Sequence, residues 1–141
     1  MIAVDSSETA SWIADEARRL FPAAEHHVVS AATVAPMLFS DPIGGGGFAS
    51  VPTEAALVAS EDTADRAVNE AKAHLGDVES AVEIGPAGQV ICEHAATHGV
   101  DVIVVGRRTK NWLSKLFDPA VSDYVIAHAP CAVLVVREPR H

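Results

Sequence analysis

Residues 101–106 read Asp-Val-Ile-Val-Val-Gly, an apolar run without the polar alternation of a strand that has one wet face. Such a run indicates a strand covered on both faces, as in a parallel sheet with helices on each side. A second run, Cys-Ala-Val-Leu-Val-Val, occupies residues 131–136. Between the two runs, Asp118-Pro119 predicts a helix start, because Asp is a good N-cap and Pro suits the first turn. Ala129-Pro130 predicts its end.

The alternation of strand and helix continues toward the N-terminus. Strands are predicted at residues 1–5, 27–34 and 78–84, and helices from Ser6-Ser7 to Phe21, across 57–75 and from Pro86 to Gly99. Strands that alternate with helices imply a parallel sheet with right-handed crossovers and helices on both faces. The predicted fold class is therefore α/β, a doubly wound, Rossmann-like sheet of five strands.

Composition narrows the class of protein. The chain has 141 residues, 49% of them hydrophobic, and a net charge of −9, so we expect one domain over residues 1–141. The acidic balance argues against nucleic acid or an anionic membrane as partner. We find no apolar run long enough for a membrane span and no basic leader, and therefore expect a cytoplasmic protein with both cysteines reduced.

The charge is unevenly distributed along the chain. Residues 54–101 carry ten acids and two bases, whereas residues 107–115 carry four of the ten basic residues and no acid. Within this basic segment, Arg107 and Arg108 have side chains suited to bidentate phosphate contacts. A solvated basic loop is the simpler interpretation. The Gly- and Pro-rich residues 35–52 predict a flexible loop, and their glycines 44–47 precede Phe48, so they do not form a phosphate-binding P-loop.

A ligand site is expected at the carboxyl ends of the strands, where open α/β sheets bind their ligands. Asp5 follows the first strand, Thr33 and Val34 end the second, and Gly106 ends the fourth. No GxGxxG follows the first strand, which argues against an ordinary dinucleotide site.

Several motifs together resemble those of the universal stress protein family, over nearly the whole chain. They are Ile-Ala-Val-Asp-Ser-Ser-Glu at 2–8, Val-Glu-Ile-Gly-Pro at 82–86 with Val-Ile at 90–91, the run at 101–106, Val-Ser at 121–122 and His-Ala-Pro-Cys-Ala-Val-Leu-Val-Val at 128–136. The resemblance implies a sheet of order 3-2-1-4-5, ATP binding in many members, and a homodimer through the strand that includes Ala132 and Val136. An exposed apolar edge strand favours the same pairing.

The resemblance also implies a nucleotide site with glycine at positions 106 and 109 and Gly-Ser/Thr at 119–120. Gly106 matches, whereas Thr109, Pro119 and Ala120 depart from that pattern, and Val121 with Ser122 fits it again.

Each matching residue then has an implied role toward ATP or AMP. Asp5 would orient the base or ribose, and Val34 or Thr33 would supply backbone contacts. Gly106 would allow close approach of the backbone, and Ser122 would cap the last phosphate.

These residues favour a homodimeric stress-response regulator that binds ATP or AMP without turnover. The departures at the motif favour an alternative, a dimeric regulator or interaction module that binds no nucleotide and docks an unidentified protein. An ATP-using enzyme on a related fold would need a catalytic base and a metal-binding carboxylate pair, and we can assign neither.

Two further patterns are weaker. His94 and His98 have the i, i+4 spacing of metal ligands, but HExxH is absent, so packing is the favoured interpretation and no metal site is predicted. Trp12 is predicted at the edge of the core. Trp112 lies in an apolar cluster within the basic segment, where it packs as a short helix or forms a docking surface.

Overall fold

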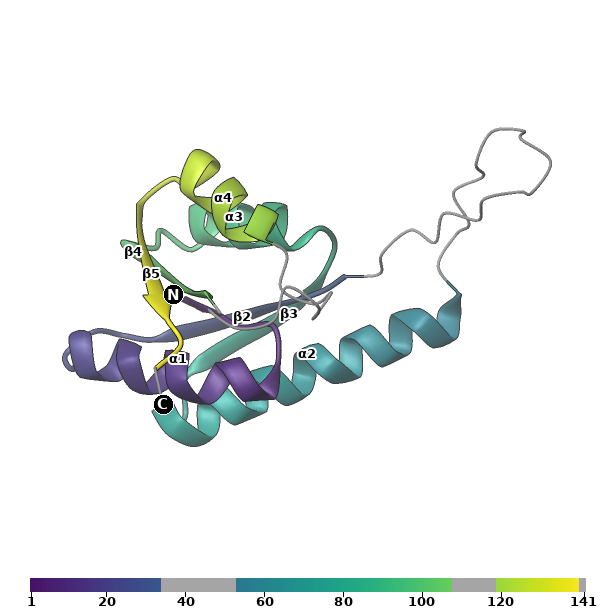
Figure 1. Ribbon diagram of the computed structural model, residues 1–141, viewed down its shortest axis with the longest axis horizontal. Coiled ribbons are helices and arrows are strands. Elements are labelled where there is room, and N and C mark those ends of the chain that lie inside the picture. Colours follow the sequence, from purple (N-terminus) through teal and green to yellow (C-terminus); the bar gives the residue numbers. More distant parts are fainter. Residues whose placement is uncertain (34–52, 108–118, 140–141) are drawn as a thin grey trace.

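The computed structural model of the chain describes residues 1–33, 53–107 and 119–139 (Figure 1). Within these ranges, five parallel strands form one sheet in the order β3-β2-β1-β4-β5. The strands are β1 (Ile2–Ala3), β2 (His27–Ala32), β3 (Glu79–Ile84), β4 (Val102–Arg107) and β5 (Ala132–Arg137). The helices are α1 (Ser7–Leu20), α2 (Glu54–Leu75), α3 (Ala87–Thr97) and α4 (Pro119–His128). The predicted α/β class and strand order are confirmed.

Helices cover both faces of the sheet, with α1 and α2 on one side and α3 and α4 on the other (Figure 1). In the described part of the chain, no helix combines the length and the apolar character that a membrane crossing needs. Val34, the Gly-rich segment 35–52, Arg108, Thr109 and the cluster around Trp112 lie outside the described residues.

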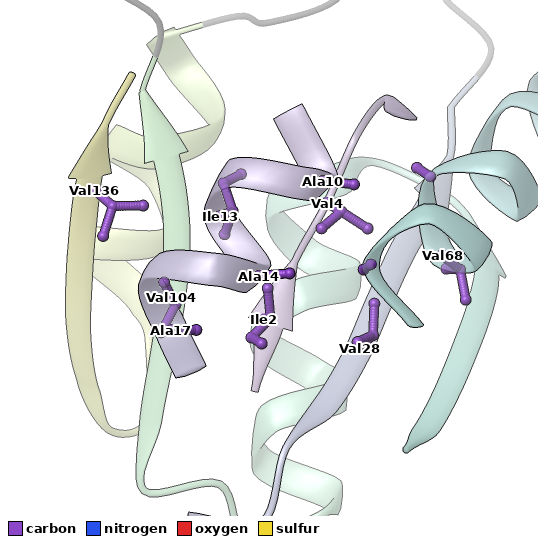
Figure 2. Close-up of a cluster of buried hydrophobic side chains, with 12 residues drawn as sticks. Ile2, Val4, Ala10, Ile13, Ala14, Ala17, Val28, Val68, Val104 and Val136 are labelled. Carbon is purple, nitrogen blue, oxygen red and sulfur yellow. The ribbon is translucent and has the colours of Figure 1, made fainter. Parts of the chain in front are cut away.

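The first of two hydrophobic clusters lies between the sheet and α1 and α2. Figure 2 shows Ile13, Ala14 and Ala17 of α1 beside side chains of the central strands. Ala10, Ile13, Ala14 and Ala17 are fully buried. The three alanines among them let the helix axis approach the sheet closely. Trp12 is half-buried against the same cluster, as predicted for an edge-of-core residue.

The second cluster lies between the sheet and α3 and α4. Ile103 and Val105 of β4 belong to it, whereas Val104 belongs to the first cluster. Successive side chains of β4 thus enter opposite cores, and this explains why its sequence is continuously apolar. Cys92 belongs to the second cluster and Cys131 packs against it. Both are free thiols, and burial raises the pKa of each.

The first strand differs most in length from its prediction. β1 contains two residues rather than the predicted five. The residues on either side of β1 extend its hydrogen bonding to the sheet. Val4 N–H donates to the Val29 carbonyl at 3.0 Å, and the Met1 carbonyl accepts from Val104 N–H at 2.8 Å. The chain then turns away at Asp5, and this places the carboxylate at the carboxyl end of the sheet.

Candidate functional site

A small pocket of about 60 Å³ lies at the carboxyl ends of β1 and β4. Four residues singled out in the sequence line it: Asp5, Gly106, Val121 and Ser122. They come from the end of β1, the end of β4 and the first turns of α4. The other lining residues are apolar: Ala3, Val4, Val29, Ala31, Ala87, Ile91 and Val105. The fold therefore brings a carboxylate and a hydroxyl together over a mostly apolar floor.

The Asp5 carboxylate is fixed by a residue that sequence reasoning missed. The Thr9 hydroxyl donates to Asp5 Oδ1, and Ser6 Oγ lies 3.1 Å from Thr9 Oγ1. Thr9 is fully buried in the first turn of α1. The signal in the sequence was a threonine four residues after the aspartate, next to serines that suggest only a helix cap. The contact holds one oxygen of the carboxylate and orients the group at the pocket.

Gly106 lines the pocket, but the position that a side chain would occupy at this residue is filled by α1, on the opposite face of the sheet. A Cβ built there would contact Ile13 Cδ1, and would lie 2.8 Å from both Ile13 Cγ1 and Trp12 Cη2. Real Cβ atoms essentially never come this close to another heavy atom. The structure therefore gives this glycine a packing role, which is to let α1 lie against β4.

Ser122 and Val121 bring the start of α4 to the pocket. Ser122 is 2% exposed, so its hydroxyl lies inside the molecule rather than on a solvated surface. The helix begins at Pro119, which has no N–H, so the helix start offers one donor fewer to an anion than the first turn of a helix usually does. Binding of a phosphate at this helix start would therefore depend more on side-chain donors than on backbone N–H groups.

Two of the described candidate residues do not line the pocket. The Thr33 hydroxyl donates to the Gly85 carbonyl at 3.0 Å, and the Thr33 carbonyl accepts a hydrogen bond from Ser60 Oγ at 3.0 Å. Thr33 thus connects the end of β2 to β3 and α2. Arg107 is exposed at the end of β4, where its carbonyl accepts a hydrogen bond from the backbone N–H of Glu138 at 3.1 Å.

The family model and the curated relatives that match this chain all belong to one family. The model of the universal stress protein family matches residues 1–137. A universal stress protein of Synechocystis, Slr1101, is 40% identical over 65 residues, which are 45% of this chain and 60% of that protein. The chain covers between 36% and 61% of the lengths of the four curated relatives that it matches.

Solved structures resemble the chain over almost its whole length. UspA from Lactobacillus plantarum gives a TM-score of 0.61 at 21% identity, covering 96% of each chain. A universal stress protein in complex with cAMP gives 0.56 at 18% identity, covering 98% of this chain and 96% of that one. An Arabidopsis thaliana family member with AMP bound gives 0.53 at 15% identity, covering 98% and 91%. These likenesses support the fold.

Proposed function

The chain belongs to the universal stress protein family, and on this premise we propose that it is a homodimeric stress-response regulator that binds an adenine nucleotide. The site we propose is the pocket at the carboxyl ends of β1 and β4. The nucleotide would be AMP or ATP. The observation that carries the proposal is the meeting of Asp5, Gly106 and Ser122, from three separate elements, at one pocket.

The chemistry of these groups suits a nucleoside phosphate. A carboxylate accepts hydrogen bonds from ribose hydroxyls or from the adenine amino group, and a buried hydroxyl donates to a phosphate oxygen. The apolar side chains of the floor suit the face of a base. Family members whose structures hold cAMP and AMP support the same class of ligand.

The start of α4 favours a ligand with few phosphates. Pro119 removes one backbone donor, and anion binding at a helix start relies on such donors. We therefore expect AMP to bind at least as tightly as ATP.

Calorimetry with AMP, ADP and ATP, each with and without Mg²⁺, tests the proposal. We expect Asp5→Asn to weaken AMP binding about 10- to 100-fold, the loss of one hydrogen bond to a charged group. Asp101→Asn is the matched control, because Asp101 is exposed just before β4, at the other end of the sheet, and should leave affinity unchanged. Absence of heat with all three nucleotides would contradict nucleotide binding.

A second candidate is a dimeric regulator that binds no nucleotide. A volume of about 60 Å³ favours it, because pockets for drug-sized ligands span about 300–1,000 Å³. Silent calorimetry together with an intact dimer would support this candidate.

Dimerisation through β5 is proposed for either candidate. β5 is an edge strand with a continuously apolar sequence from Ala132 to the buried Val136, and an unpaired edge of this kind is a template for a second copy. Sedimentation velocity of Ala132→Lys should show a shift toward monomer, because charge on an edge opposes strand pairing. Ala73→Lys, at an exposed position of α2, is the control that should remain dimeric.

We also propose that the protein acts by binding rather than by turnover. Among the described residues, Asp5 is the one ionisable side chain that lines the pocket. A hydrolase or ligase needs a base and a group that stabilises the leaving phosphate. Release of ADP from ATP above the buffer rate, lost in Asp5→Asn, would overturn this view.

A further inference from the structure

Three histidines meet at the opposite end of the sheet from the nucleotide pocket. His27 is the first residue of β2, His94 lies in the last turn of α3, and His98 is the C-cap of that helix. One ring nitrogen of each lies within 4.8 Å of those of the other two. The i, i+4 spacing along the helix brings His94 and His98 together, and their rings stack with centroids 3.9 Å apart. The fold adds the third ring from a strand 67 residues earlier in the chain.

The register of the sheet explains why acidic side chains accompany these rings. His27 pairs with Glu79 across β2 and β3, and Ala31 pairs with Glu83. Side chains two residues apart on a strand share a face. Val29, between His27 and Ala31, packs in the cluster beneath α3. Both glutamates therefore belong to the face that α3 covers.

Two of the three rings have a hydrogen-bonded oxygen at Nδ1, and the third has a carboxylate nearby. His94 Nδ1 lies 2.5 Å from Glu83 Oε1, and His98 Nδ1 lies 2.9 Å from the His94 carbonyl oxygen. His27 Nδ1 lies 3.4 Å from Glu79 Oε2. A carbonyl or an ionised carboxylate only accepts hydrogen bonds, so these partners assign the proton to Nδ1 of His94 and of His98. In a neutral ring, the lone pair then lies on Nε2.

This tautomer directs the lone pair of His94 Nε2 toward the ring of His27. His94 Nε2 lies 2.8 Å from His27 Nε2, and His94 is only 4% exposed. The contact is a hydrogen bond when His27 carries its proton on Nε2. With that proton on Nδ1, on the side of the Glu79 carboxylate, both Nε2 lone pairs are available to one cation. Metal-binding histidines characteristically donate their second ring N–H to a carboxylate or a carbonyl. His94 and His98 have that arrangement here, and the C-terminal end of α3 adds a partial negative charge that favours a cation.

We propose that His27, His94 and His98 bind one Zn²⁺ ion through their Nε2 atoms, with water as the fourth ligand. Three neutral imidazoles suit Zn²⁺. Zn–N bonds of about 2.0–2.1 Å place ligand nitrogens about 3.3 Å apart in a tetrahedron, so the 2.8 Å pair widens on binding. The rings of His94 and His98, stacked at 19°, turn so that both Nε2 lone pairs point at the ion. A surface hollow of about 430 Å³, lined by all three histidines and Glu79, gives the ion and its water access.

The bound ion would join the start of β2 to the end of α3. This link lies at the amino end of the sheet, away from Asp5 and Ser122, so zinc binding does not depend on the nucleotide proposal. Asp5→Asn is expected to leave the zinc affinity unchanged, and this separates failure of one proposal from failure of the other.

Titration of chelator-stripped protein with Zn²⁺ in competition with a chromophoric chelator tests the site. The wild type should bind one ion per chain, and His98→Ala should bind it at least about 100-fold more weakly. His98 is the position to change because it is exposed, whereas loss of the buried His94 threatens folding. His128→Ala is the control, since His128 is an exposed histidine at the end of α4 whose ring stacks on Tyr124.

A second readout uses Co²⁺ in place of Zn²⁺. The wild type should give the intense visible absorption of tetrahedral Co²⁺, and Glu83→Gln should keep this absorption while affinity falls about 10- to 100-fold, as for a positioning residue. Zinc binding that is absent in the wild type, or equal in the wild type and His98→Ala, would overturn the proposal.

Discussion

Replacing Gly106 by alanine would place a methyl group in space that α1 already fills. The new Cβ would contact Ile13 Cδ1 and lie 2.8 Å from Ile13 Cγ1 and from Trp12 Cη2. Ile13 is fully buried and cannot swing into solvent, so the helix or the strand must shift. The φ angle of Gly106 is not positive, and the cost therefore comes from packing and not from backbone strain.

The expected magnitude follows from these contacts. Overfilling a packed core costs about 1–3 kcal/mol, and contact with two side chains places Gly106→Ala near the upper end, about 3 kcal/mol. For a chain of this size, that loss lowers Tm by about 6–12 °C. Thermal and urea unfolding of both proteins, followed by circular dichroism, measure the change.

A double-mutant cycle identifies the cause. Ile13→Val removes Cδ1, so Gly106→Ala should cost about 1 kcal/mol less in that background. Gly99→Ala is the control, because a Cβ at Gly99 meets nothing within 4 Å and its cost comes from a φ of +60°. It should combine additively with Ile13→Val. A loss below about 0.5 kcal/mol for Gly106→Ala, or a coupling of zero with Ile13, would refute the packing explanation.

Two further predictions concern the α1–α2 contact and the buried strand β2. The Asp15 carboxylate, 2.9 Å from His74 Nδ1, raises the pKa of that histidine, so the folded state binds the proton more tightly than the unfolded state. The stabilisation is therefore complete below the unfolded pKa of about 6.5 and is lost as pH rises through the folded pKa. Because both groups are partly exposed, we expect less than about 1 kcal/mol, and urea unfolding of His74→Gln should lack this pH dependence. The buried Ser30 hydroxyl donates to the Val4 carbonyl at 2.7 Å. Ser30→Ala should lower the free energy of unfolding by about 1–3 kcal/mol, and an unchanged urea midpoint would contradict this bond's importance.

The buried strands were predictable because continuous apolar runs in the sequence indicate burial on both faces. A run such as residues 101–106 has apolar side chains toward both faces, a pattern typical of a strand between two helical layers. β1 was predicted too long because apolar character continues to Val4, whereas pairing ends where the chain turns toward α1. The identity of the pocket residues followed from position at strand ends and from family resemblance, and their ligand roles stay predictions.

The sequence did not reveal contacts made by the topology. The local pattern pairs His94 with His98, but nothing in it connects either one to His27, which arrives through the register of β2 beneath α3. The motif explained Gly106 by ligand approach, whereas a side chain at this position would collide with Ile13 and Trp12 of α1. Thr9 was not singled out, because Ser6 and Ser7 already accounted for the start of the helix. Such roles depend on which elements become neighbours in space.

Native mass spectrometry of freshly purified protein tests the central claim most directly, because it reports the oligomeric state and any retained ligand together. A nucleotide-binding homodimer predicts the mass of two chains plus up to two adenine nucleotides, with the added mass lost in Asp5→Asn and kept in Asp101→Asn. A monomer that carries no added mass, even after incubation with excess AMP or ATP, would contradict it.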